Sequence, residues 1–304
     1  MPESIRIRAR DGQALAGDLF LPAGPARAAV VIAPAMGVPR RYYGPFAAFL
    51  ARQGLAALSL DYRGVGGSRT GPLRTCPATL RDWAEHDLGG AVDLLAHRVP
   101  DVPLLWVGHS VGGQLLGLLA GVDVAGALLV GAQSGHWRLW AGTWRWRMWL
   151  LWHALIPGLV PVLGRLPAAI LGGGEDVPPG VAREWAAWGR ERDYVWSFAR
   201  PRGGLAFATL AAPVVSYAFT DDPFAPPRAV EALAAFYSAA RAQVRLVRPA
   251  DVGASAIGHF GFFRARFEPT LWREASLFLA GAASRGSGSP SPPPGERVGE
   301  RGRS

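Results

Sequence analysis

The pentapeptide Gly108-His109-Ser110-Val111-Gly112 constrains the fold of this chain more than any other segment. It follows an apolar run at residues 102–107 with the length of a buried strand, and it precedes a helical segment at residues 114–119. A serine between glycines at such a junction is typical of a sharp strand-to-helix turn that holds the serine in a strained backbone conformation. The glycines leave room for the turn and for a substrate. Ser110 is therefore a candidate nucleophile, and the alternative is a small-residue connector between a strand and a helix.

A serine hydroxyl is a weak nucleophile until an imidazole takes its proton, and a carboxylate must hold that imidazole in the correct tautomer. His259 is the histidine best placed for this role, because it lies in the glycine-flanked segment Ile257-Gly258-His259-Phe260-Gly261, after a strand-like run at residues 243–247. The alternative for His259 is a surface histidine in a Phe-rich turn. The other histidines lie on a helix before the serine, in the pentapeptide itself or in a tryptophan-rich insertion: His86, His97, His109, His136 and His153.

The carboxylate is expected after the apolar run at residues 212–219, which has the pattern of a buried strand and ends in Thr220-Asp221-Asp222-Pro223. Asp222 is the first candidate. Asp221 competes with it, because an aspartate before a proline often serves only as a turn former. Either carboxylate is also a possible cap for the helix expected at residues 228–237.

The order Ser110, Asp222, His259 on alternating strand and helix patterns resembles the α/β-hydrolase superfamily. The resemblance covers nearly the whole chain. Residues 60–68 resemble the segment after the fourth strand of that family, and Asp222-Pro223-Phe224-Ala225-Pro226 resembles its acid loop. The resemblance implies the α/β-hydrolase fold, with Ser110, Asp222 and His259 as a catalytic triad.

The alternation of strands and helices independently predicts an α/β fold with a mostly parallel central sheet and helices on both faces. Ligands of such sheets bind at the carboxyl ends of the strands, where all three triad candidates lie. Parallel strands are expected at residues 29–33, 55–61, 103–107, 124–130, 213–219 and 243–247, after an antiparallel pair at 4–10 and 15–21 joined by Asp11-Gly12.

Cleavage of an acyl bond passes through an oxyanion, which needs two preorganised backbone N–H donors. Val111 is expected to supply one of them. By resemblance, the second comes from the loop after residues 29–33, where Pro34-Ala35-Met36-Gly37 replaces the family's frequent His-Gly pair and Met36 matches the donor position. The alternative for Met36 is ordinary core packing.

Residues 135–208 lack a strand of the core pattern and are dense in tryptophan, which predicts a helical cap inserted after the sixth strand. Trp137, Trp144 and Met148 recur at helical spacings and are candidate pocket residues, favouring a hydrophobic substrate. Alternatively, these tryptophans pack only on each other and on the core. The expected division is a core of residues 1–134 and 209–280, the cap at 135–208, and a disordered Ser/Pro/Gly/Arg tail at 281–304.

Composition excludes several functions. The 32 basic residues are all arginines, and they are spread along the chain despite a net charge of +9, so no nucleic-acid partner is expected. The absence of lysine excludes Schiff-base and P-loop lysine chemistry. Cys76 is the single cysteine, and the histidines have no zinc-binding spacing, so no cofactor and no metal are expected.

Residues 148–164 are strongly apolar and free of Asp, Glu and Arg, but they fall short of the roughly 20 residues of a membrane span. No transmembrane segment is therefore expected, while contact of a basic, Trp-rich helix with an anionic membrane surface is an alternative. The first ten residues contain no apolar signal-peptide region, which favours a cytoplasmic location.

Together these features predict a serine hydrolase that cleaves a carboxylic ester or thioester through an acyl-enzyme on Ser110. His259 is the expected general base and acid, and Asp222 orients its imidazole. The substrate is expected to be a small hydrophobic acyl compound. Acyl transfer on the same triad is one alternative, and a non-catalytic ligand-binding or membrane-surface protein of the hydrolase fold is another.

Overall fold

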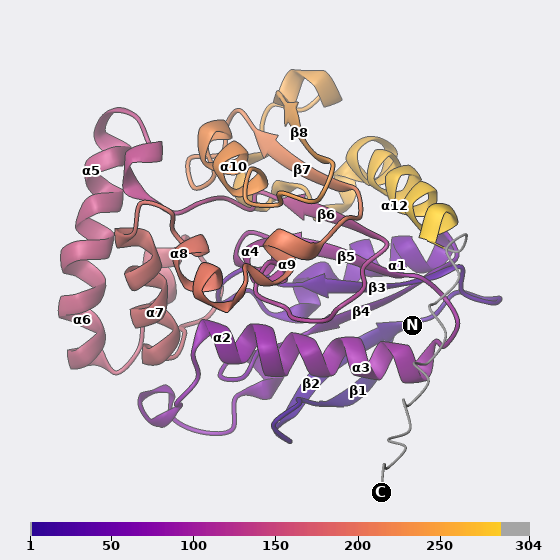
Figure 1. Ribbon diagram of the computed structural model, residues 1–304, viewed down its shortest axis with the longest axis horizontal. Helices are drawn as coiled ribbons and strands as arrows, with labels where there is room; N and C mark the ends of the chain where they lie inside the picture. Colours follow the sequence, from indigo (N-terminus) through magenta and orange to yellow (C-terminus); the bar gives the residue numbers. More distant parts are fainter. Residues whose placement is uncertain (1, 287–304) are drawn as a thin grey trace, which may run out of the picture.

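An eight-stranded sheet runs through the centre of the computed structural model, which describes residues 2–286 (Figure 1). The strand order is β1-β2-β4-β3-β5-β6-β7-β8. Strands β1 and β2 form an antiparallel hairpin, β2 pairs antiparallel with β4, and the strands from β3 to β8 are parallel. The strands are β1 (Glu3–Arg8), β2 (Ala14–Phe20), β3 (Ala28–Ala33), β4 (Leu55–Leu60), β5 (Leu104–His109), β6 (Gly126–Val130), β7 (Val214–Phe219) and β8 (Ala242–Val247).

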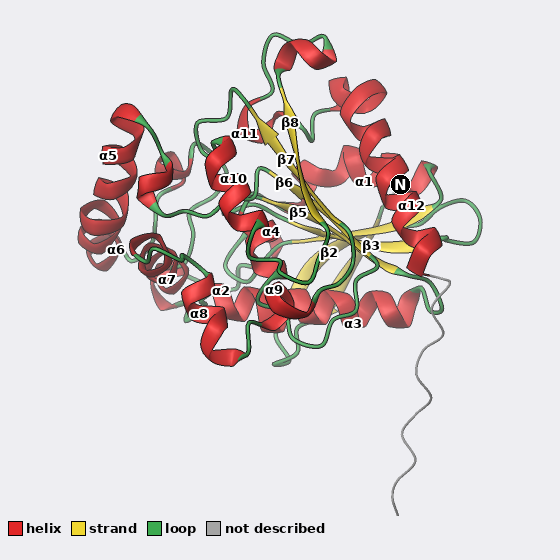
Figure 2. Cartoon of the chain, turned by 45° about the horizontal axis from the view of Figure 1, so that its top comes forward, coloured by secondary structure: helices red, strands yellow, loops and turns green. Residues whose placement is uncertain are grey.

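Helices cover both faces of the sheet (Figure 2). Helices α1 (Gly44–Arg52) and α12 (Arg273–Gly286) pack on one face, in an apolar cluster that includes Phe46 and Trp272. The opposite face is covered by helices whose apolar side chains join a second cluster with the cap. Because β3, β4 and β6 are buried on both faces, their sequences are nearly continuous apolar runs. The helices of this second face are α2 (Leu80–Asp82), α3 (Gly89–Arg98), α4 (Val111–Leu116) and α10 (Pro227–Ala234), and the short α11 (Gly258–Gly261) lies in the loop after β8.

The cap lies between β6 and β7, at one end of the sheet (Figure 1). Its first two helices are joined by a π-helical turn at Leu151–Leu155, so they form one helix of 22 residues, Gly142–Leu163. The Trp152 ring meets Trp185 edge-on, with 4.6 Å between ring centroids, and this contact ties the long helix to α7. The cap helices are α5 (Gly142–Leu150), α6 (Ile156–Leu163), α7 (Pro179–Arg190), α8 (Trp196–Ala199) and α9 (Leu205–Thr209).

The fold predicted from the sequence is confirmed: each expected strand is present, and the cap follows the sixth strand. The end of the chain differs from the expectation in one respect. Helix α12 continues to Gly286, past the expected start of the tail at residue 281. Ala282 and Ala283 are buried against the sheet, so these small apolar residues extend the helix. The rest of the expected tail, residues 287–304, lies outside the described residues.

Candidate active site

Ser110 occupies a sharp turn between β5 and α4. Its backbone has φ 51° and ψ −116°, in the left-handed half of the map that non-glycine residues rarely adopt. This conformation is typical of a serine presented at the end of a strand for chemistry. The turn lies against the end of β3, because a Cβ at Gly112 would come within 2.1 Å of the Ala33 carbonyl oxygen. Among the described residues, Ser110 Oγ makes no hydrogen bond, and the expected bond to His259 Nε2 is therefore not formed in this structure.

His259 and Asp222 meet beside this turn. The distance from His259 Nδ1 to Asp222 Oδ2 is 2.7 Å, and both side chains are buried. The other carboxylate oxygen of Asp222 accepts hydrogen bonds from the backbone N–H groups of Phe224 and Ala225, at 2.8 and 3.0 Å, which fix its orientation. Gly131, with φ 58°, leaves room for the pair, because a Cβ there would lie 3.2 Å from His259 Nδ1.

Asp221 has a different position from its neighbour. Its Oδ2 accepts hydrogen bonds from the backbone N–H groups of Ile257 and Gly258, at 2.8 and 3.0 Å. These two residues immediately precede His259. Of the two competing aspartates, Asp222 therefore contacts the imidazole, and Asp221 anchors the loop that carries it.

The loop after β3 brings a further set of backbone donors to Ser110. Tyr43 Oη accepts a hydrogen bond from Ala35 N–H at 2.8 Å, which holds the loop immediately before Met36. Met36 lines the same cavity as Ser110, and its N–H has no acceptor among the described residues. Val111 is the first residue of α4, where a backbone N–H has no partner within the helix. Met36 thus lies in the cavity of Ser110 and Val111 directly follows the serine, while their role as oxyanion donors stays a prediction.

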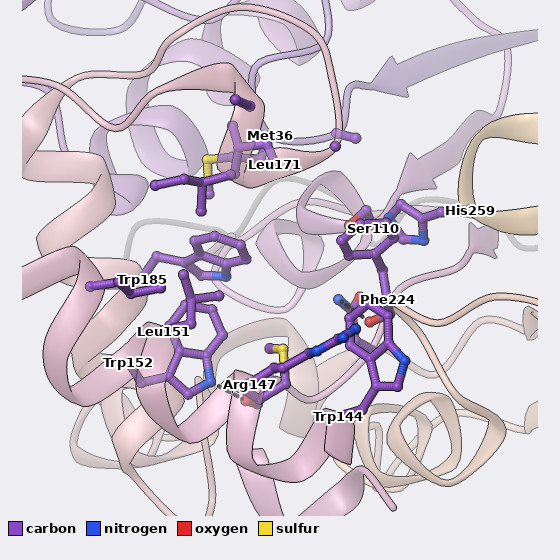
Figure 3. A pocket seen from close by; sticks show the side chains of 18 of the residues that line it. Met36, Ser110, Trp144, Arg147, Leu151, Trp152, Leu171, Trp185, Phe224 and His259 are labelled. Carbon is purple, nitrogen blue, oxygen red and sulfur yellow. Dashed lines mark hydrogen bonds between the residues drawn. The ribbon is translucent and has the colours of Figure 1, made fainter. Parts of the chain in front are cut away.

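A cavity of about 380 Å³ extends from Ser110 and His259 into the cap (Figure 3). Its walls are mostly apolar, with side chains from the long cap helix on one side and from the core loops on the other. This is the size and character of a small-molecule site. Besides Ser110 and His259, the lining consists of Ala35, Met36, Gln133, Gly135, Trp144, Arg147, Met148, Leu151, Trp152, Leu155, Ala169, Ile170, Leu171, Gly172, Trp185, Phe224 and Phe260.

A known family matches part of the chain. Residues 24–159 match the family described as serine aminopeptidase, S33, and this match spans the turn that carries Ser110. The chain has the α/β-hydrolase fold, and the matched segment resembles that family. No curated protein matches it in sequence.

Solved structures share this fold. A soluble variant of monoglyceride lipase from Saccharomyces cerevisiae, in complex with a substrate analogue, superposes with a TM-score of 0.65 at 15% identity, covering 93% of this chain and 96% of the lipase. A thermophilic esterase from Thermogutta terrifontis gives 0.57 at 17% identity, over 92% of this chain and 99% of the esterase. An esterase from Exiguobacterium antarcticum gives 0.56 at 16% identity, over 91% and 99%. At these identities the likeness concerns the fold.

Of the three residues expected to line the pocket, Trp144 and Met148 do so, whereas Trp137 is not among the lining residues that the structure describes. The backbone explains the difference. The expected helical spacing ran from Trp137 through Trp144, but the chain is extended at Trp140 and Ala141, and α5 begins only at Gly142. Trp137 is therefore out of phase with α5, and its ring lies 6.2 Å from that of Trp146.

Sequence reasoning missed a buried chain of hydrogen bonds behind the site. Tyr43 Oη, which accepts from Ala35 N–H, lies 2.9 Å from His109 Nδ1, and His109 Nε2 lies 3.0 Å from the carbonyl oxygen of His259. A carbonyl only accepts, so Nε2 carries the proton and Tyr43 donates to Nδ1. Complete burial, with a further contribution from the charge of His259, holds the pKa of His109 well below its usual range. This neutral ring links the loop of Met36 to the backbone of His259.

Within residues 2–286, no three His, Cys, Asp or Glu side chains gather as potential metal ligands. The cavity lining includes the Ser110 hydroxyl and the His259 imidazole, which is paired with a carboxylate, together with the polar side chains of Gln133 and Arg147. The hydroxyl and the paired imidazole suit acyl transfer to and from an oxygen nucleophile.

Proposed function

We propose that this α/β-hydrolase is a serine esterase that cleaves a carboxylic ester or thioester through an acyl-enzyme on Ser110. The observation that carries the proposal is the 2.7 Å contact between His259 Nδ1 and Asp222 Oδ2, in the same cavity as a serine at φ 51°. Its fold neighbours include proteins named as esterases and a monoglyceride lipase, which supports the same class of reaction.

In the proposed reaction, His259 Nε2 takes the proton of Ser110 as Oγ attacks the carbonyl carbon of the substrate. The carbonyl oxygen becomes an oxyanion held by the N–H groups of Met36 and Val111. Asp222 stabilises the imidazolium of His259, and Asp222 Oδ2 keeps the Nδ1–H group of His259 oriented toward it. His259 then gives the proton to the leaving alcohol or thiol, and a water activated by the same imidazole releases the acid and restores Ser110.

The walls of the cavity favour a hydrophobic acyl group. Trp144, Met148 and Leu171 surround the space beyond Ser110, and burying an acyl chain against them gains roughly 0.8 kcal/mol per methylene. Arg147 also lines the cavity, but its guanidinium stacks on the Trp144 ring, 5.1 Å from the ring centroid. The proposed substrate class is therefore an ester or thioester of an apolar acid.

Labelling by a fluorophosphonate probe tests the proposal, with Ser110→Ala as control. The folded protein is expected to react with the probe and the variant to remain unlabelled. Hydrolysis of p-nitrophenyl esters of increasing acyl length then measures the selectivity of the cavity, and added alcohol shows whether product is diverted from the free acid. Absence of labelling in protein with an intact near-UV circular dichroism spectrum would refute an activated serine.

A further inference from the structure

The long cap helix exposes an unusual amount of apolar surface. Ten large apolar side chains are exposed in the part of the chain that the structure describes, and most of them lie on this one helix. Trp146 is 63% exposed and Val162 is 72% exposed, at its two ends. Exposed apolar patches of this kind mark interaction surfaces. The seven members, which we call the cap face, are Trp146, Trp149, Leu150, Leu155, Leu159, Val162 and Leu163.

A single stripe fixes this helix to the rest of the protein. Met148, Trp152, Ile156 and Val160 recur at every fourth position and are buried, within the same apolar cluster as α7. The helix is long and apolar enough to cross a membrane, but it lies along α7 with one side packed on protein (Figure 1). Part of the remaining surface lines the cavity, and the rest faces outward from one end of the helix to the other, as in a helix that lies in the plane of an interface.

The segment of sequence that contains the cap face carries charge of one sign. The sequence contains no Asp or Glu from residue 124 to residue 174. Arg138, Arg145 and Arg147 have no carboxylate partner among the described ion pairs, and two of them stack on tryptophan rings. Uncompensated guanidinium groups beside exposed tryptophans fit the headgroup region of a bilayer that carries anionic lipids.

We propose that the cap face docks on an anionic lipid bilayer, with the helix lying flat in the headgroup region. A second copy of the chain fits this surface less well, because a symmetric contact would bring the same unpaired arginines of the two copies together. The cavity reaches the surface at this helix, since Arg147 and Leu155 are exposed and also line it. Docking would therefore place the cavity beside the lipid, although the docking itself does not depend on the reaction proposed for Ser110.

Flotation of the full-length protein with vesicles tests the docking. The Ser110→Ala background keeps the lipids intact, and vesicles of phosphatidylcholine alone are compared with vesicles that also contain phosphatidylglycerol. We expect flotation with the mixed vesicles at low salt, and its loss as salt is added. Val162→Glu and Trp146→Glu are each expected to weaken binding at least tenfold. Leu277→Glu is the matched control, because Leu277 is 70% exposed on α12, outside the cap, and binding should be unchanged.

Four results would overturn the proposal. These are equal binding to neutral vesicles, equal loss with Leu277→Glu, retention in the membrane after an alkaline carbonate wash, and a dimer in sedimentation velocity that Val162→Glu dissociates. The third result would indicate a spanning helix and the fourth a second copy of the chain. Thermal unfolding checks that each glutamate variant is folded. Arg138→Gln tests the contribution of charge, because it leaves the apolar side chains of the cap face unchanged. It is expected to reduce binding to the vesicles that contain phosphatidylglycerol and to leave binding to phosphatidylcholine vesicles unchanged.

Discussion

The central sheet and the cap are built from similarly apolar sequence, but they bury it to different extents. In β3 every side chain is buried, because helices cover both faces of the sheet. In the helix Gly142–Leu163 one stripe is buried and the large apolar side chains on the other sides are exposed. The sheet therefore provides a rigid frame, whereas the cap provides two apolar surfaces, one toward the cavity and one toward the outside.

The polar groups of the site are divided in the same way. Ser110, Asp222 and His259 follow β5, β7 and β8, so the sheet sets their positions, and backbone hydrogen bonds hold both Asp222 and the loop before His259. The cap supplies aromatic and aliphatic walls. We therefore expect changes at the sheet end to alter the rate of the reaction, and changes in the cap to alter which substrate is chosen.

The largest effect is expected from Asp222→Asn. An amide at this position accepts from Nδ1 poorly and favours the wrong imidazole tautomer, so kcat should fall about 10⁴-fold with little change in KM. Asp221→Asn is the matched control, because the neighbouring carboxylate bonds only to backbone N–H groups. Asp221→Asn should lower the melting temperature, and kcat should fall far less than it does in Asp222→Asn. Steady-state kinetics of the two variants decide the assignment, and an equal fall in kcat for both would show it to be wrong.

Tyr43→Phe is expected to have the next largest effect. Removing this hydroxyl leaves two buried groups, Ala35 N–H and His109 Nδ1, without their partner. The cost in unfolding free energy should be about 1–3 kcal/mol per unsatisfied group. Because Ala35 adjoins Met36, kcat should also fall, while KM stays close to that of the wild type.

Tyr62→Phe is the control for this change. Tyr62 donates one hydrogen bond of 3.2 Å to Pro34 in the same loop but does not bond to His109. Urea unfolding and kinetics of both variants are compared. If Tyr62→Phe lowers kcat as much as Tyr43→Phe, the chain of bonds through His109 has no special part in positioning the site.

The neutral His109 predicts a loss of stability in mild acid. Burial lowers its pKa well below 6.5, whereas the unfolded chain binds a proton near that pH. Unfolding then takes up one proton more, so the unfolding free energy should fall by ~1.4 kcal/mol per pH unit as the pH drops below about 6.5. Urea unfolding between about pH 7 and about pH 5.5 measures this slope. His109→Gln should flatten it, and an unchanged slope in that variant would assign the effect to other groups.

Much of the sheet end could be predicted because its signals are local. Strands buried on both faces appear as short apolar runs, and the serine turn depends on glycines next to it in sequence. The bond between Tyr43 and His109 had no such signal, because it joins residues 66 positions apart in a chain that contains six tyrosines. The choice between Asp221 and Asp222 also needed coordinates, since adjacent residues after a strand point in different directions.

The cap was harder to predict for a related reason. Tryptophan spacing indicates a helix, but it does not show where the helix begins, and a short extended break changes the direction of every side chain before it. The prediction that Trp137 lines the pocket assumed one uninterrupted helix from Trp137 to Met148. The backbone is extended at Trp140 and Ala141, so the Trp137 side chain does not share the face of α5 that lines the cavity. Helical periodicity also could not show that most of the long helix would remain uncovered.

The smallest expected effect is a change in acyl-chain selectivity, and it tests whether the cap determines which substrates are preferred. Replacing Trp144 and Met148 together by Ala removes two walls of the cavity without touching the triad. The wider space should raise kcat/KM for bulky acyl groups relative to short ones by about tenfold, since differences of 1–3 kcal/mol are typical for methylene groups in apolar pockets. Trp137→Ala removes a tryptophan of the same cap that does not line the cavity, so it should leave the ratio unchanged. An unaltered ratio in the double variant would mean that the sheet loops, through Phe224 and Phe260, set the selectivity and that the cap helix serves chiefly its outer surface.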